Sequence, residues 1–134
     1  MAAAAQAGFQ SVEIFENDLI GSALRPQQVR RLMEDAGLSC SLYQPFRDFE
    51  GMPGALRQRA LDRAERKFDV MEALGTDRIL VCSNCSPASL GDRQRIVDDF
   101  RELGERAARR GILVGYEALA WGGTSTIIAM YGRS

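Results

Sequence analysis

The feature that most limits the fold of this chain is a glycine-to-strand pattern that occurs four times. Gly8, Gly37, Gly75 and Gly111 each follow a helical pattern and precede a short apolar run. A glycine in this position is typical of the C-cap of a helix. The runs recur roughly every 30 to 40 residues, the length of a β-strand with its crossover helix. The four predicted strands are residues 11–15, 39–44, 78–83 and 112–119.

Three amphipathic helices are predicted between these strands. The first begins near Pro26, a residue suited to the first turn of a helix. The second covers about 55–74 and the third about 92–110, with apolar residues at steps of three and four. The predicted buried positions are Val29, Leu32, Met33 and Ala36 in the first helix, Ala60, Ala64, Phe68, Met71 and Leu74 in the second, and Ile96, Val97, Phe100, Leu103 and Ala107 in the third. The residues expected to face water are Arg57, Arg63, Glu65 and Arg66.

The alternation of strands and helices indicates an α/β fold with a parallel sheet and right-handed crossovers. An open doubly wound sheet and a (β/α)8 barrel are the two candidate architectures. A dinucleotide-binding sheet is disfavoured because no Gly-x-Gly-x-x-Gly follows the first strand, and because residues 15–18 read as an acidic turn that would repel a pyrophosphate. A barrel normally needs about 250 residues, and this chain has 134. The sequence therefore predicts a partial (β/α)8 TIM barrel of about four βα units with parallel strands.

Ligands of either architecture bind at the carboxyl ends of the strands, and these ends are unusually polar in this sequence. Glu117 stands at the end of an apolar strand, where a carboxylate is either paired with an arginine or functional. Glu13 interrupts the first strand, where it either lines the barrel interior near a substrate or pairs inside the core. Arg47 follows the second strand, and its guanidinium either forks onto a substrate carboxylate or forms a loop salt bridge with Asp48 or Glu50.

Three further residues are candidates for the same pocket. Tyr43 and Gln44 are expected to line it, and Trp121 is expected to form one of its walls. Aromatic residues at strand ends more often serve packing than recognition, so the packing alternative stays open for the tyrosine and the tryptophan.

Composition excludes several classes of function. The chain has no histidine, which excludes an imidazole general base, a Ser-His-Asp triad and a His-rich zinc site. A net charge of −1 gives no electrostatic case for binding nucleic acid or an acidic membrane surface. Neither a signal peptide nor an apolar stretch of roughly 18 residues is recognised, so no membrane partner is expected.

The cysteines favour an intracellular, cytoplasmic protein with reduced thiols, because three is an odd number. Cys82 and Cys85 form a C-x-x-C pair, which must be considered as a redox or zinc motif. There is no second pair for zinc, and Cys82 continues the apolar run of its strand. We therefore interpret these cysteines as structural.

Several segments resemble a known family. They read GFQSVEIF (8–15), LYQPFRDFEG (42–51), RAERKFD (63–69), VCSN (81–84) and GYEALAWG (115–122). Together they resemble the xylose isomerase-like TIM barrels, also called sugar-phosphate isomerases/epimerases, and within them the bacterial 3-dehydroshikimate dehydratase branch. The resemblance covers about residues 2–122.

The resemblance implies a divalent-metal lyase that converts 3-dehydroshikimate to protocatechuate. Glu117 matches the first metal ligand of these barrels, and Mg²⁺, Mn²⁺ or Co²⁺ is the implied cofactor. The substrate-binding residues expected around it are Arg47, Glu13, Tyr43, Gln44 and Trp121.

Residues 1–122 are therefore expected to be the N-terminal part of such a barrel, and residues 123–134 a divergent tail that does not match the family. We expect the chain to be inactive by itself, since the implied remaining ligands would lie beyond it. A sugar or sugar-phosphate isomerase/epimerase and a noncatalytic half-barrel interaction module remain as alternatives. A half-barrel would leave two open strand edges, which favour a homo-oligomer.

Overall fold

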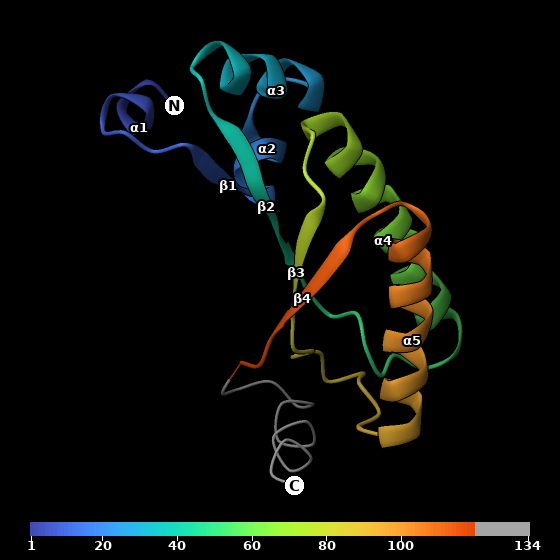
Figure 1. Cartoon of the computed structure of the whole chain (residues 1–134). Helices are drawn as coiled ribbons and strands as arrows, with labels where there is room; N and C mark the ends of the chain where they lie inside the picture. Colours follow the sequence, from blue (N-terminus) through green and yellow to red (C-terminus); the bar gives the residue numbers. More distant parts are fainter. Residues whose placement is uncertain (120–134) are drawn as a thin grey trace, which may run out of the picture.

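The computed structural model describes residues 1–119 and contains one parallel four-stranded sheet (Figure 1). Its strands are β1 (Ser11–Phe15), β2 (Ser39–Phe46), β3 (Arg78–Cys82) and β4 (Leu113–Glu117), which pair in the order β1-β2-β3-β4. The four predicted strands and their parallel pairing are thus confirmed. Trp121 and the predicted tail 123–134 lie outside the described residues.

Five helices are described between and before these strands, namely α1 (Ala2–Gln6), α2 (Glu16–Gly21), α3 (Pro26–Asp35), α4 (Gly54–Leu74) and α5 (Arg93–Arg109). The three predicted amphipathic helices correspond to α3, α4 and α5. The acidic turn predicted after β1 is wrong, because the chain forms the short helix α2 there. Its first turn holds Glu16 and Asp18, and carboxylates are favoured at a helix N-terminus by the backbone dipole.

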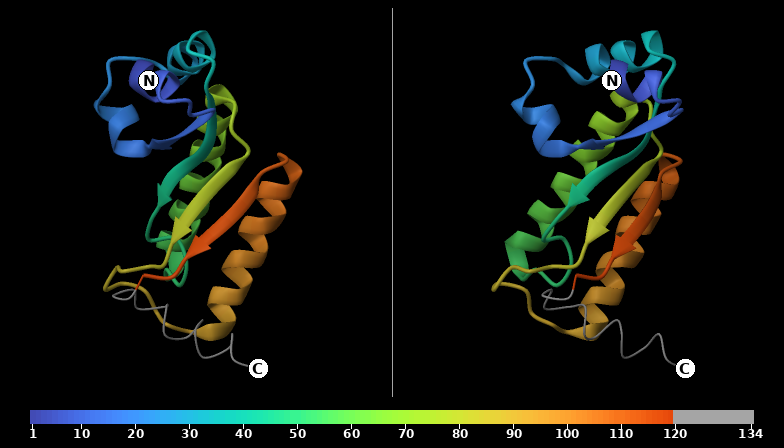
Figure 2. Two further views of the ribbon diagram at one scale, coloured as in Figure 1. Left: turned by 60° about the vertical axis from the view of Figure 1, so that its left-hand side comes forward. Right: turned by 90° about the vertical axis from the view of Figure 1, so that its left-hand side faces the viewer.

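The helices α4 and α5 run along one face of the sheet and leave the opposite face open within residues 1–119 (Figure 2). Tyr43, Phe46, Ile79 and Val81 are buried toward the helices. On the other face Leu113 keeps 62% of its surface exposed. The nearly continuous apolar run of β4 is typical of a parallel strand covered on both faces, whereas within residues 1–119 helices cover only one face of it.

The core lies between the sheet and the helices, and most predicted core positions of the helices are buried there. Ala36 and Phe100 are partly buried against this core, and Leu32 and Val97 are exposed, with 46% and 40% of their surface accessible. Successive helical residues differ by about 100° around the axis. Val97 therefore points well away from Ile96, which is buried, and Leu32 lies at the margin of the stripe that contains Met33.

A polar network joins α4 to α5 and includes Arg57, which was expected to face water. Asp99 is only 2% exposed and accepts hydrogen bonds from Arg57 Nε at 2.7 Å and from the Gly51 N–H at 2.8 Å. Arg57 Nη2 also donates to Glu102 at 2.7 Å, and Arg106 Nη2 donates to the same carboxylate at 2.8 Å. Arg57 is therefore an interhelical ion-pair residue rather than a solvated one.

No helix in the part of the chain that the structure describes is both long enough and apolar enough to cross a membrane.

The packing of α5 predicts a large difference between two leucine substitutions. Leu103 is fully buried, so Leu103→Ala should lower the free energy of unfolding by about 2–5 kcal/mol through lost contacts and a cavity. Leu32→Ala removes the same atoms from an exposed helical position and should cost less than about 1 kcal/mol. Urea unfolding of the two variants measures the difference, and equal losses would contradict the described core.

The interhelical network predicts a pH-dependent contribution to stability. Arg57, and then Arg106, hold the pKa of Glu102 below its ordinary value of 4.5. A carboxylate with a lowered folded-state pKa stabilises the fold above the unfolded pKa, and this contribution is lost as the pH falls through the folded pKa. The stability advantage of the wild type over Glu102→Gln should therefore be present at neutral pH and shrink well below pH 4.5.

Urea unfolding at neutral pH and at a pH well below 4.5 tests this expectation. Glu105→Gln is the matched control, because Glu105 is an exposed residue of the same helix and takes part in no ion pair within residues 1–119. A Glu102→Gln difference that does not change with pH would contradict the proposed pairing.

Candidate functional site

The carboxyl ends of β2, β3 and β4 point to the same edge of the sheet, where the loops that follow them meet (Figure 2). Hydrogen bonds link these loops across long separations in the sequence. The Asn84 N–H donates to Glu50 Oε1 at 2.8 Å, and the Cys85 N–H donates to Asp48 Oδ1 at 3.2 Å. The Leu119 N–H donates to Ser83 Oγ at 2.8 Å. This edge is therefore an ordered surface on which side chains from several loops are held together.

Glu117 ends β4 and lies beside Cys82 of β3, to which it is paired in register. The Cys82 thiol donates to Glu117 Oε2 at 3.6 Å, and the Ser83 N–H donates to the Glu117 carbonyl at 2.9 Å. Burial raises the pKa of the Cys82 thiol, and the neighbouring carboxylate raises it further. No ion pair among residues 1–119 includes Glu117, so the predicted arginine alternative is not realised there. Glu117 is an exposed residue.

Glu13 lies on the same open side of the sheet and is exposed. Its Oε2 accepts a hydrogen bond from Gln44 Nε2 at 3.1 Å, which makes this amide its partner. The alternative in which Glu13 pairs inside the core is therefore wrong for the described structure. The open face corresponds to the interior of a closed barrel. Along each strand of such a barrel, side chains that face the interior alternate with side chains that face the helices.

Tyr43 and Gln44 are neighbours on β2 and therefore point to opposite faces of the sheet. Tyr43 is buried toward the helices, and burial is the main cause of the raised pKa of its hydroxyl, with Glu16 adding to the effect. The structure thus brings Gln44 to Glu13 and separates Tyr43 from both. A direct role for Tyr43 in substrate binding stays a prediction.

Arg47 is exposed directly after β2. Neither Asp48 nor Glu50 pairs with its guanidinium within the described part of the chain, because Asp48 accepts from the Cys85 N–H and Glu50 accepts from the Asn84 N–H. The backbone around Arg47 is fixed by Arg63, whose Nη2 donates to the carbonyls of Arg47 and Asp48 at 3.1 and 2.7 Å. Arg47 is therefore an exposed cation at the carboxyl ends of the strands, and the backbone that carries it is held in place.

Three buried polar residues of this region were not among the site residues predicted from the sequence. Glu50 is fully buried and accepts hydrogen bonds from the Asn84 N–H and, at 3.4 Å, from Tyr116 Oη. Asn84 is also fully buried, and its side-chain amide donates to the Glu50 carbonyl. Asp99 belongs to α5 but holds Gly51 of this loop. The polarity of residues 83–84 at a strand end was a signal for Asn84, whereas nothing local marked Glu50 or Asp99 as buried.

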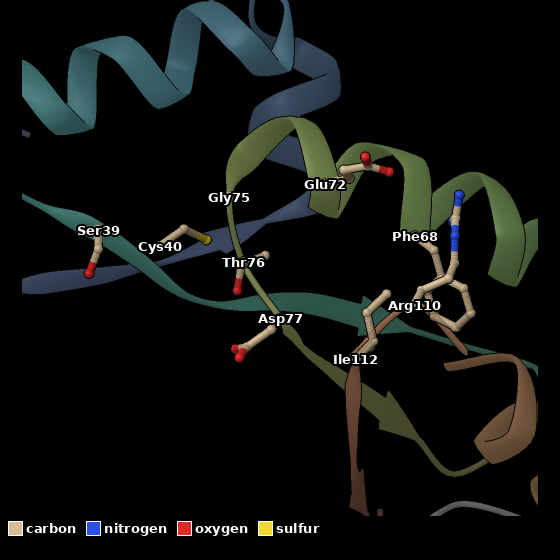
Figure 3. A pocket seen from close by; sticks show the side chains of 9 residues that line it. All are labelled: Ser39, Cys40, Phe68, Glu72, Gly75, Thr76, Asp77, Arg110 and Ile112. Carbon is tan, nitrogen blue, oxygen red and sulfur yellow. The ribbon is translucent and has the colours of Figure 1, made fainter. Parts of the chain in front are cut away.

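A separate hollow of about 670 Å³ lies at the opposite end of the sheet (Figure 3). Side chains from the start of β2, from the turn before β3 and from α4 line it, among them Cys40, Glu72 and Asp77. Ligands of parallel α/β folds bind at the carboxyl ends of the strands, whereas this hollow is at the amino ends. We therefore do not assign it to the functional site.

The described residues can supply part of a metal site. Glu117 offers a hard oxygen ligand of the type that Mg²⁺ and Mn²⁺ prefer. No group of three His, Cys, Asp or Glu side chains that could hold a metal ion occurs among residues 1–119. Glu117 therefore fits the chemistry of a metal ligand, but the described donor set is incomplete.

These features define a class: a parallel α/β barrel segment with helices on one face and a polar site at its strand ends. The family model of the xylose isomerase-like TIM barrel matches residues 1–130. The chain therefore belongs to the xylose isomerase-like TIM barrel family.

Similarity to individual proteins is also high. A 3-dehydroshikimate dehydratase of Pseudomonas putida is 59% identical over 120 residues, which is 90% of this chain and 19% of the relative. A solved fusion of a xylose isomerase-like TIM barrel with 4-hydroxyphenylpyruvate dioxygenase has a TM-score of 0.87 and 59% identity, over 90% of this chain and 20% of that one. The chain thus spans about a fifth of the length of these relatives.

More distant proteins share the fold. The IolI protein, solved with a bound zinc atom, has a TM-score of 0.74 and 12% identity over 87% of this chain and 44% of that one. The predicted family and the partial-barrel fold class are confirmed by these comparisons together with the parallel sheet.

The surroundings of the cysteines predict an order of chemical reactivity. All three cysteines are free, and Cys85 is exposed whereas Cys40 and Cys82 are buried with raised thiol pKa values. Because the thiolate is the reactive form, an alkylating agent should modify Cys85 first. Glu117→Gln should speed the reaction of Cys82, since it removes a charge that raises the pKa of this thiol. Time-resolved alkylation read by tandem mass spectrometry tests both statements. Equal rates at Cys82 and Cys85 in the wild type would contradict the first, and an unchanged Cys82 rate in Glu117→Gln would contradict the second.

Proposed function

We propose that this chain supplies the first part of the active site of a divalent-metal-dependent 3-dehydroshikimate dehydratase. The observation that carries the proposal is the 59% identity to the Pseudomonas putida relative of that name, which extends over 90% of the chain. The exposed carboxylate of Glu117 at the carboxyl end of β4 supports it, because this end of the strands is where such folds bind their ligands.

Glu117 would hold the metal through a carboxylate oxygen, together with ligands outside residues 1–119. Bound there, a divalent cation would polarise the ketone of 3-dehydroshikimate and make the neighbouring carbon more acidic. The zinc atom in the IolI structure supports a divalent metal within this fold. The thiol of Cys82 holds Glu117 Oε2, and the Ser83 N–H holds the Glu117 carbonyl, so that the side chain is oriented from β3.

The other residues of the strand ends have roles in binding the substrate. Arg47 would pair with the substrate carboxylate, because its guanidinium has a planar fork of donors and no ion-pair partner within the described residues. Glu13 and Gln44 form a hydrogen-bonded pair on the open face, which would be the interior of the complete barrel. They would contact the hydroxyl groups of the substrate. Loss of a proton and of a hydroxyl group as water then gives protocatechuate.

A chimera tests this function directly. The matched 120 residues of the Pseudomonas putida relative are replaced by the corresponding residues of this chain, and the formation of protocatechuate is followed by its ultraviolet absorbance. We expect an active chimera. Glu117→Gln in the chimera should lower kcat and weaken the binding of Mn²⁺ by at least the factor of about 10 to 100 that loss of an outer-shell partner typically costs, since a metal ligand itself is lost.

The matched control is Glu105→Gln, which makes the same chemical change at an exposed position of α5 and should leave activity and Mn²⁺ binding unchanged. An active chimera in which Glu117→Gln binds Mn²⁺ normally would refute the metal-ligand role. The isolated 134-residue chain should show no turnover with Mg²⁺, Mn²⁺ or Co²⁺, because three ligating side chains do not meet within residues 1–119.

The alternatives give different results in the same assays. A sugar or sugar-phosphate isomerase/epimerase would make the chimera inactive toward 3-dehydroshikimate while Mn²⁺ binding remained dependent on Glu117. A noncatalytic half-barrel module would give neither activity nor metal binding. In that case the open strand edges of β1 and β4 would be the surfaces through which copies associate, and light scattering would detect the oligomer.

A further inference from the structure

A small basic pocket lies between α2, the end of β2 and α4, and nothing in the proposed dehydratase chemistry uses it as a whole. Its volume is about 220 Å³, below the roughly 300–1,000 Å³ of pockets that enclose drug-sized ligands. A space of this size suits a single small group. The residues that line it are Glu16, Asn17, Pro45, Arg47, Arg63 and Lys67.

The charge of this pocket is strongly positive. Three cations, Arg47, Arg63 and Lys67, face a single carboxylate, that of Glu16, which leaves a formal charge of +2. Lys67 is neutralised locally by its ion pair with Glu16. Arg47 and Arg63 take part in no ion pair in the described part of the chain. Asp48 and Glu16 attract Arg63 at longer range, so these two guanidinium groups are the cations of the pocket without a contact ion pair among the described residues.

Two of the cations, Arg63 and Lys67, are also held in place before any ligand arrives. The guanidinium of Arg63 lies 5.4 Å from the centre of the Phe46 ring, and the ammonium of Lys67 lies 5.3 Å from the same centre. Arg63 Nη2 is bound to the carbonyls of Arg47 and Asp48. Burial lowers the pKa of Arg63, which shows that its charge is poorly solvated. An anion would thus meet a preorganised and partly desolvated group, so little side-chain entropy is lost on binding.

We propose that this pocket binds a small dianion of the phosphate class through Arg47, Arg63 and Lys67. A phosphate group carries about −1.5 to −2 charges at neutral pH, which matches the formal charge of the pocket better than the single charge of a carboxylate. Its tetrahedral oxygens can accept hydrogen bonds from cations that approach from different elements. This site is separate from the Glu117 carboxylate and does not depend on the proposed dehydratase function, although Arg47 borders both regions.

Inorganic phosphate is the probe for this site. The complete 134-residue chain is titrated with phosphate at constant ionic strength, and backbone amide shifts are followed by NMR. Saturable shifts should occur at Asn17, Arg47 and Lys67. Acetate at the same concentration should bind more weakly. Equal affinities for acetate and phosphate would overturn the assignment of a dianion, and the absence of saturable shifts would overturn the site.

Three variants decide whether the pocket itself is responsible. Arg47→Gln should weaken phosphate binding about tenfold, because it removes one charge-assisted contact. Arg59→Gln makes the same charge change at an exposed position of α4 and should leave the affinity unchanged. Glu16→Gln should tighten binding roughly threefold, since it removes the competing carboxylate.

If Arg47→Gln and Arg59→Gln weaken phosphate binding equally, the affinity depends only on the net charge of the protein, and the proposed pocket is refuted. If Arg47→Gln does not fold, Glu16→Gln still decides the question, because unchanged or weaker phosphate binding by that variant contradicts the charge argument.

Discussion

The common direction of the strands is the constraint on which the rest of this structure depends. Each crossover returns the chain to the same end of the sheet, so β1 to β4 pair in chain order and run parallel. Their carboxyl ends therefore meet at one edge (Figure 2), and hydrogen bonds there join Asn84 to Glu50 and Ser83 to Glu117 although these residues are far apart in the sequence. The same crossovers put α4 and α5 on one face and leave Glu13 and Leu113 on the other.

Buried polar groups hold the loops at the carboxyl ends of the strands in place. Burial of a carboxylate is costly unless hydrogen bonds replace its hydration. Asp99 meets this requirement by holding Arg57 and the Gly51 N–H, and Glu50 meets it by holding the loop after β3. The loop after β2 is thereby tied both to α5 and to the neighbouring loop. Its backbone is further fixed by Arg63, which connects the packing of α4 to the position of Arg47.

Opposite charges are separated along this edge. The carboxylate of Glu117 lies on the open face beside the Cys82 thiol, whereas Arg63 and Lys67 of the basic pocket belong to α4, and Arg47 borders both regions. Such a separation suits an edge that binds a cation in one place and an anionic group in another. Membership of the xylose isomerase-like TIM barrel family agrees with the use of this end of the sheet, and the chain spans about a fifth of its Pseudomonas putida relative.

The sequence by itself determined the elements and their order. Glycines after helical patterns, apolar runs and three-to-four spacing are local signals, and they were sufficient for the four strands and for α3, α4 and α5. The motifs also identified the family. Tertiary structure decided which polar groups became buried, because the partners of Asp99 and Glu50 come from distant loops and no local pattern names them. It also separated Tyr43 from Gln44 and exposed Leu32, because the orientation of each element toward the core is set by packing against its neighbours.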